Sequence, residues 1–345
     1  MAVAGAALVC AGCPVADMAG TPEWTTYGKI KTDFALNSNG ATTPADGSTM
    51  RFVNNITPDP DGTLSMTAQD TRFGAKLDMG VVKGLVEVDF HGTDVNFRHA
   101  YVTLDLGNDM KLLAGQTWDV FSPLNPGMLN YTVGWDAGNV GHRSPQFRWE
   151  WAPEMGLIDS VQASFSDPND TRIIMPDIQA RVGFRLTEAV NLGASIVLGS
   201  VDVGNDGTEE DIFGLAVDVK AKLGDNLAIV GEWHSGQNLD DYMGNIDVGI
   251  PNNDEVGCDG LWVAVVITPA DNLTVNAGLM FETNDDGDIG AGTRSDNSCI
   301  FGNAIWHLNE QTDVGIEISK WETEYKAAAT EFDNLRIQGS VIVKF

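Results

Sequence analysis

The sequence lacks long hydrophobic runs. Of its 345 residues 43% are hydrophobic, yet no uncharged apolar stretch reaches the roughly 18 residues that a membrane-spanning helix needs. The chain is also poor in basic residues, with 20 lysines and arginines against 49 acidic residues and a formal net charge of −29. Because nucleic-acid binding requires clustered basic side chains, this balance excludes a nucleic-acid partner. A soluble β or α/β protein remains possible, as does a membrane barrel in which apolar and polar residues alternate.

Cysteine is scarce as well. Two of the four cysteines, Cys10 and Cys13, lie in a short run of apolar and small residues. We interpret residues 1–20 as a signal peptide, or the remnant of one with a truncated start, and residues 21–345 as a single domain. A lipoprotein signal with Cys13 as the lipidated residue is the alternative. In an exported protein Cys258 and Cys299 are then candidates for a disulfide, the alternative being two unpaired thiols.

From Trp24 onwards, segments of about ten residues alternate apolar and polar side chains and are bounded by Gly, Pro, Asn or Asp, as is typical of β-strands. Ten residues is about what a tilted strand needs to cross a bilayer. The sixteen segments are 24–36, 65–79, 84–92, 95–106, 110–119, 142–152, 157–166, 177–187, 190–200, 211–223, 226–236, 260–268, 272–282, 299–308, 311–322 and 332–345.

The connections between these segments alternate in length. Tight turns such as Gly107 to Asp109 and Pro269 to Asp271 alternate with mostly longer, acidic loops such as 37–64 and 237–259. A soluble sandwich has no reason to place all its short turns at one end. The pattern therefore predicts an all-β fold: a closed antiparallel transmembrane β-barrel of about sixteen strands, with short periplasmic turns and long outer loops.

The last segment carries the clearest alternation. One face holds Leu335, Ile337, Gly339, Val341, Val343 and Phe345, and the other holds Arg336, Gln338, Ser340, Ile342 and Lys344. An alternating final strand that ends on an aromatic residue resembles the signature that outer-membrane proteins present to their insertion machinery.

The third outer loop, residues 120–141, is unusually apolar. We expect it to fold into the lumen and narrow it; the alternative is a loop that covers a subunit interface. The residues expected to form the constriction are Asp119, Phe121, Asn125, Tyr131, Trp135 and Asp136.

Most of the few basic side chains fall on the polar faces of the segments. The predicted pore-lining residues are Lys29, Lys31, Arg72, Lys76, Arg148, Arg181, Arg185 and Arg336. Facing Asp119 and Asp136 across the lumen, they would offer small anions a series of weak sites, for which guanidinium groups suit carboxylates. The alternative is that they neutralise lumenal acids such as Asp70 and Glu87 in structural pairs. Arg98 is ambiguous, because strict alternation places it on the lipid face.

The histidines and the acidic loops give little sign of catalysis or of a resident cofactor. The five histidines lie on different segments without motif spacing, so we do not expect an enzyme. No cofactor is expected, and no metal site stands out. Asp285, Asp286 and Asp288 are a weak calcium candidate that lacks the ligand series of an EF-hand loop, and the acidic rim as a whole could bind divalent cations.

Several stretches in the first 150 residues resemble the DcaP-like porins. They include YGKIKTDFAL (27–36), TRFGAKL (71–77), VEVDFHG (86–92), FRHAYVTL (97–104), GQTWDVFSP (115–123) and GHRSPQFRWEW (141–151). The resemblance implies a homotrimeric porin in a Gram-negative outer membrane, in contact with lipid and lipopolysaccharide. It also implies passive diffusion of small solutes, with a preference for small anions such as carboxylates and dicarboxylates. Two alternatives remain: a cation-preferring general porin, and a plugged barrel with a surface or structural role.

Overall fold

The computed structural model describes residues 21–39, 48–55, 62–92, 94–168, 173–203, 207, 209–250, 255–328 and 331–345. The predicted signal segment, residues 1–20, lies outside these residues. In the described parts of the chain, no helix has the length and apolar character to cross a membrane.

The described chain is almost entirely β-structure. The strands are β1 (Glu23–Asn37), β2 (Thr63–Thr67), β3 (Arg72–Asp78), β4 (Val82–Asp89), β5 (Asn96–Gly107), β6 (Met110–Trp118), β7 (Arg143–Trp151), β8 (Ile158–Ser166), β9 (Ile173–Arg185), β10 (Val190–Val201), β11 (Glu210–Lys222), β12 (Leu227–Gln237), β13 (Gly257–Ala270), β14 (Leu273–Asn284), β15 (Arg294–His307), β16 (Thr312–Tyr325) and β17 (Phe332–Lys344). Two short 3-10 helices, η2 (Asp240–Tyr242) and η3 (Asn245–Asp247), lie between β12 and β13.

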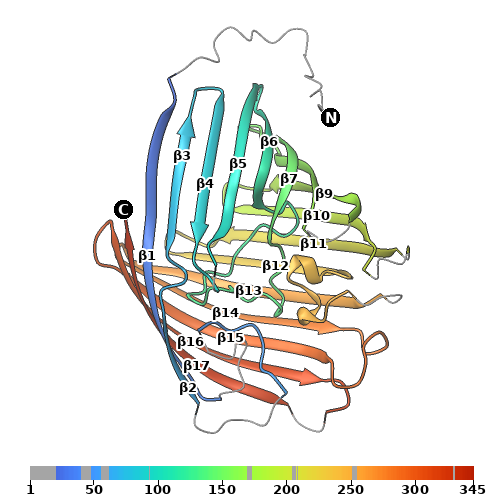
Figure 1. Ribbon diagram of the computed structural model, residues 1–345. Coiled ribbons are helices and arrows are strands. Elements are labelled where there is room, and N and C mark those ends of the chain that lie inside the picture. The colour runs from blue at the N-terminus through green and yellow to red at the C-terminus, as the bar shows by residue number, and fades with distance from the viewer. Residues whose placement is uncertain are drawn as a thin grey trace.

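The strands form one closed antiparallel barrel (Figure 1). From β3 onwards each strand pairs with the next one in the chain, and β1 pairs with β17 to close the ring. Both β2 and β3 pair with β1, so together they fill one position that is interrupted at residues 68–71. The seventeen strands therefore occupy sixteen positions, which confirms the predicted count.

The alternation of short and long connections is also confirmed. At one end of the barrel the connections are short, from two residues between β5 and β6 to six residues between β7 and β8. At the other end the longest connection, between β1 and β2, has 25 residues. The short-turn end is the periplasmic end in barrels of this kind.

The barrel is apolar outside and polar inside. In β17 the outward Leu335 and Val341 are exposed, whereas the inward Arg336 and Gln338 are buried. A lipid-facing exterior and strand pairing without a free edge are the two conditions for spanning a bilayer with strands. The structure is a transmembrane β-barrel of the Gram-negative outer-membrane type.

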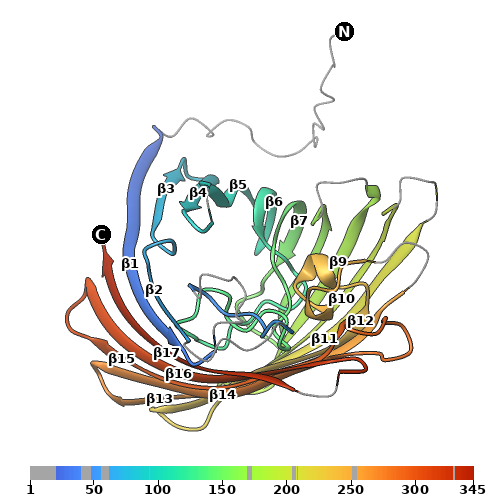
Figure 2. The ribbon, with the colours of Figure 1, turned by 60° about the horizontal axis from the view of Figure 1, so that its bottom comes forward.

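Segments of the outer loops lie inside the ring of strands, as Figure 2 shows. Part of the first outer loop (48–55) and the third outer loop (119–142) lie inside the ring, which confirms the predicted fold of the third loop. Met50, Met128 and Ala137 of these loops pack on Trp262 and Trp321 of the wall. A second apolar cluster joins the ends of the third loop to η2 and to β10 and β11. The core of this protein therefore lies inside the barrel.

Candidate functional site: the loop-narrowed lumen

Buried acidic side chains on the wall fasten the third outer loop through its backbone. Glu232 of β12 accepts hydrogen bonds from the Leu124 amide (2.8 Å) and the Ser122 hydroxyl. Glu317 of β16 accepts from the amides of Leu129 (2.6 Å) and Asn130 (3.2 Å). In the same way Gln179 of β9 accepts from the amides of residues 120 and 121, and Glu282 of β14 from that of residue 138. The wall thus satisfies backbone donors that would otherwise be buried without a partner.

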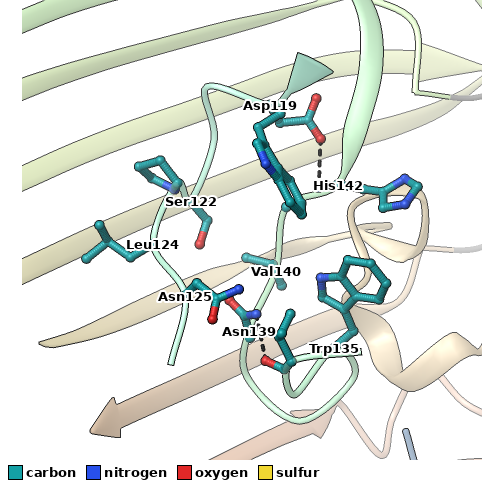
Figure 3. A pocket seen from close by; sticks show the side chains of 12 residues that line it. Asp119, Ser122, Leu124, Asn125, Trp135, Asn139, Val140 and His142 are labelled. Carbon is teal, nitrogen blue, oxygen red and sulfur yellow. Dashed lines mark hydrogen bonds between the residues drawn. The ribbon is translucent and has the colours of Figure 1, made fainter. Parts of the chain in front are cut away.

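The two ends of the third loop enclose a small cavity of about 120 Å³, shown in Figure 3. Asp119 lies beside it and accepts hydrogen bonds from the His142 amide (2.9 Å), the Ser144 hydroxyl and the Gln179 amide group. Burial raises the pKa of Asp119 despite these bonds. Asp119 is therefore buried and joins the loop ends instead of lying open to the lumen, although Arg148 of the predicted basic wall still acts on its carboxylate.

Asp136 is likewise withdrawn from the lumen. It is fully buried and forms an ion pair with Arg51 of the first outer loop. Burial raises the pKa of Asp136 to about 7, with Arg51 opposing the shift. Of the six predicted constriction residues, Asn125 is exposed and Tyr131 is half-buried, whereas Phe121 and Trp135 are buried like the two aspartates.

A β-bulge resolves the ambiguity of Arg98. The register between β4 and β5 shifts after Glu87, and this shift turns the Arg98 side chain inward. Arg98 then pairs with Glu87 and Asp89, both at 2.9 Å, and lies 4% exposed. Tyr131 of the third loop donates its hydroxyl to Asp89 (2.8 Å), so the loop touches this wall as well. Burial and Asp89 raise the pKa of Tyr131 to about 12, which keeps it a donor.

Three of the predicted pore-lining residues surround a single carboxylate. Asp70, in the break between β2 and β3, lies 2.9 Å from Lys29, 3.1 Å from Lys31 and 2.8 Å from Arg72. Together with Arg98, these four cations form ion pairs with four carboxylates: Asp33, Asp70, Glu87 and Asp89. This part of the lumen wall is therefore balanced in charge.

The other predicted residues are spread along the barrel. Arg148 pairs with Glu150 (3.1 Å), Arg181 with Asp218 (2.8 Å) and Arg185 with Asp159 (2.5 Å). Arg336 is buried at the outer end, where it donates to the Ser48 carbonyl of the first outer loop. Lys76 lies over the Tyr27 ring, 5.0 Å from its centroid. Many of the inward arginines thus form the structural pairs that we considered as the alternative; their contact with solutes remains a prediction.

The sequence analysis missed Arg143, the first residue of β7. Among the residues that the structure describes, no carboxylate lies within ion-pair distance of it. Its guanidinium lies 4.5 Å from the centroid of the Trp118 ring and 5.9 Å from that of Trp135, and one of its nitrogens is buried without a hydrogen-bond partner. Burial, reinforced by Arg143, lowers the pKa of His142 to about 3, so the neighbouring imidazole is neutral. Strict alternation hid this residue, because it assigns Arg143 to the lipid face.

Arg143 lines a cavity of about 670 Å³ at the outer rim where β4 to β7 end. Arg51, Tyr131, Trp135 and His142 line it as well. A second cavity of about 740 Å³ lies near the short-turn end of the same wall and holds Lys76, Lys111 and Arg148 beside Glu150. Each cavity combines cationic donors with aromatic or polar walls, an arrangement that can bind a small carboxylate.

The predicted disulfide does not form, and both Cys258 and Cys299 are free and buried. They lie on β13 and β15 with β14 between them, opposite Asn284 and Met280 respectively. The two cysteines are therefore separated by roughly 13 Å along the strands and by about 9.5 Å across them. A disulfide requires Cα atoms within about 7 Å.

The calcium candidate does not gather its carboxylates. Asp285 and Asp288 accept hydrogen bonds from the amides of Gly287 and Gly257. Within the described ranges, the one group of three possible metal ligands is His234, Cys258 and Glu282.

The comparison that decides the fold is with a solved structure. The chain is similar to the outer membrane channel DcaP of Acinetobacter baumannii, with a TM-score of 0.80, 20% identity and coverage of 95% of this chain and 98% of that one. This is the porin fold. The same porin fold relates the chain to an anion-selective porin from Comamonas acidovorans (TM-score 0.67, 13% identity, 94% and 100% covered). The chain also shares this fold with the trimer form of in-vitro folded OmpT, an outer membrane protein of Vibrio cholerae (TM-score 0.58, 13% identity, 94% of this chain and 99% of that one covered). No family model and no curated protein sequence matches the chain.

Proposed function

We propose that the protein is an outer-membrane porin that passes small hydrophilic solutes by diffusion and favours small anions such as mono- and dicarboxylates. The porin fold, the lipid-compatible exterior and the lumen narrowed by the third loop support the channel. The neighbours described as a channel and as an anion-selective porin are consistent with it.

Arg143 carries the anion part of the proposal. The four cations around Asp70 and Glu87 are matched by four carboxylates, whereas Arg143 has no carboxylate within ion-pair distance in the described structure. The Arg143 guanidinium, which lies beside the rings of Trp118 and Trp135, keeps its positive charge, and no neighbouring carboxylate in the described structure neutralises it. Its planar set of donors suits a carboxylate.

The proposal extends to the assembly: a homotrimer in contact with membrane lipid and lipopolysaccharide. The trimer form of a structure with the same fold supports this oligomeric state. Cross-linking of the detergent-extracted protein and its elution mass test it, and a monomer under both measurements contradicts it.

Reversal potentials in planar bilayers under a salt gradient test ion preference. Removing a charge about 5 Å from the ion path in water changes the energy of an ion there by about 0.8 kcal/mol, or roughly fourfold in the permeability of that ion. We therefore expect Arg143→Gln to lower the anion-to-cation permeability ratio several-fold. Lys320→Gln is the matched control, because Lys320 lies exposed beside Glu322 on the barrel exterior. An anion preference that Arg143→Gln leaves unchanged contradicts the role of this residue.

The acidic composition favours a second candidate, a cation-preferring general porin. The net charge of −29 creates a long-range field that concentrates cations at the mouths. A cation-selective reversal potential in the wild type supports this candidate and overturns the anion preference. If the folded wild-type protein conducts no ions at all, the barrel is plugged and the channel proposal fails.

A further inference from the structure

Three possible metal ligands meet on the inner wall near the outer end of the barrel. His234 of β12, Cys258 of β13 and Glu282 of β14 bring one ligand atom each within 4.8 Å of the other two. All three side chains are almost fully buried, with exposures of 1%, 4% and 0%. They lie on three adjacent strands, so the rigid sheet fixes their spacing.

Gly260 makes this meeting possible. It lies directly opposite His234 on one side and directly opposite Glu282 on the other. A Cβ atom at this position would lie only 2.1 Å from Cε1 of the His234 ring, so the imidazole occupies the space that a side chain would fill. The missing side chain lets His234 reach across β13 towards Glu282.

Three polar atoms of the cluster are left without hydrogen-bond partners. Both ring nitrogens of His234 and the Oε1 atom of Glu282 are buried and unpartnered, whereas Glu282 Oε2 accepts the Gly138 amide at 3.0 Å. His234 Nε2 lies 3.7 Å from Glu282 Oε1, which is too long for a hydrogen bond. It is close to the separation of about 3.4 Å expected for two ligands around tetrahedral zinc with bonds near 2.1 Å. Buried polar groups without partners are unusual and are explained by an ion in some structures.

The chemistry of the three groups also fits one class of metal. A thiolate, an imidazole and a carboxylate together suit zinc and similar divalent transition metals, whereas calcium and magnesium prefer oxygen ligands alone. A thiolate and a carboxylate each carry one negative charge, so a divalent ion would make the buried cluster neutral. Asn245 of η3 lies against the cluster, where its Oδ1 accepts a hydrogen bond from the Cys258 thiol at 3.4 Å. Metal binding would replace this thiol proton.

We propose that His234, Cys258 and Glu282 form a binding site for a zinc-type divalent metal ion, made possible by Gly260 between them. The ion would tie β12, β13 and β14 together beneath η2 and η3 of the sixth outer loop. It would also hold the third outer loop through the bond from Gly138 to Glu282. The site is structural and does not depend on the selectivity of the channel.

Metal content and a cobalt spectrum test the site on the full chain, purified folded in detergent. Cys10→Ser and Cys13→Ser are introduced throughout, so that the N-terminal cysteine pair cannot contribute ligands. We expect one zinc ion per chain by elemental analysis. Cobalt in its place should give the intense thiolate-to-metal absorption of a cysteine-bound ion. The spectrum is recorded without any change at the site, so it does not depend on whether a site variant folds.

Cys258→Ser should reduce bound metal to background, and Glu282→Gln and Gly260→Ala should weaken it. Cys299→Ser is the matched control, since Cys299 is also buried on the inner wall and should leave metal content unchanged. Folding of each variant is checked by its heat-modifiable mobility on gels. Folded protein that holds no metal above background, or a cobalt spectrum without the thiolate band, overturns the proposal. Metal binding that Cys258→Ser leaves intact in a folded barrel overturns it as well.

Discussion

Removal of the Glu317 carboxylate should release the tip of the third loop from the wall. Glu317 is 1% exposed and accepts both the Leu129 and the Asn130 amides. In Glu317→Ala these two donors lose their acceptor, and each buried unsatisfied group costs about 1–3 kcal/mol. The total of about 2–6 kcal/mol corresponds to roughly a thirtyfold to twenty-thousandfold shift towards a displaced loop. The Leu129 carbonyl, which accepts from Lys31 at 2.7 Å, remains as a tether and limits the displacement.

Single-channel conductance and limited proteolysis measure this release. We expect larger or noisier conductance and new cleavage within residues 120–141 in Glu317→Ala. Glu317→Gln should have a smaller effect, because the amide keeps one oxygen acceptor. Glu310→Ala, in an exposed periplasmic turn, is the control that should resemble the wild type. If Glu317→Ala folds and shows wild-type conductance and resistance to protease, the backbone bonds to Glu317 do not hold the loop.

Two further predictions concern buried charges. Burial raises the pKa of Asp136 from 3.8 to about 7, so its contribution to loop stability is fully present below about pH 4 and is lost as the pH rises through about 7. Protease resistance of the third loop should therefore fall between about pH 4 and pH 7, and Asp136→Asn should weaken that dependence; an equal fall in both proteins contradicts this origin. Arg98→Ala should lower the free energy of unfolding by about 3–5 kcal/mol, because it leaves Asp89 buried without its cation and removes the nearer of the two cations that pair with Glu87. Urea titration in detergent measures this, and Arg185→Ala, which breaks a half-exposed pair worth about 0–1 kcal/mol, is the comparison that should stay near the wild type.

The barrel could be predicted from the sequence because its two determinants are local. Alternation of period two assigns each strand residue to lipid or lumen, and connection lengths assign each turn to an end of the barrel. The strand from Phe332 to Lys344 shows both: Leu335 and Val341 face outward, and Arg336 and Gln338 face inward as expected. The apolar third loop was predictable for a similar reason, since an apolar segment this long is stable only when it is covered.

The site could not be predicted to the same depth, because it depends on departures from alternation. Arg98 turns inward through a bulge in the register of β4 and β5, which no periodicity reveals. Arg143 lies at the point where β7 begins, so the loop before it, rather than the strand, decides its direction. The partners of Asp119 and Asp136 come from segments up to 85 residues away, and only the folded loops bring them together.

Two glycines on the inner wall allow side-chain contacts that the sequence did not predict. Gly193 of β10 lies between Arg181 of β9 and Asp218 of β11, and a Cβ atom there would lie 2.0 Å from the Asp218 carboxylate and 2.2 Å from the Arg181 guanidinium. Gly260 occupies the same kind of position between His234 and Glu282. In each case two long side chains from strands that do not pair with one another meet over the strand between them. Strand order and register are needed to find such meetings, because the sequence separates the partners by 37 residues in one case and 48 in the other. At Gly193 and Gly260 the missing side chain thus lets second-neighbour strands interact, and the two places give an ion pair and the cluster proposed to bind metal.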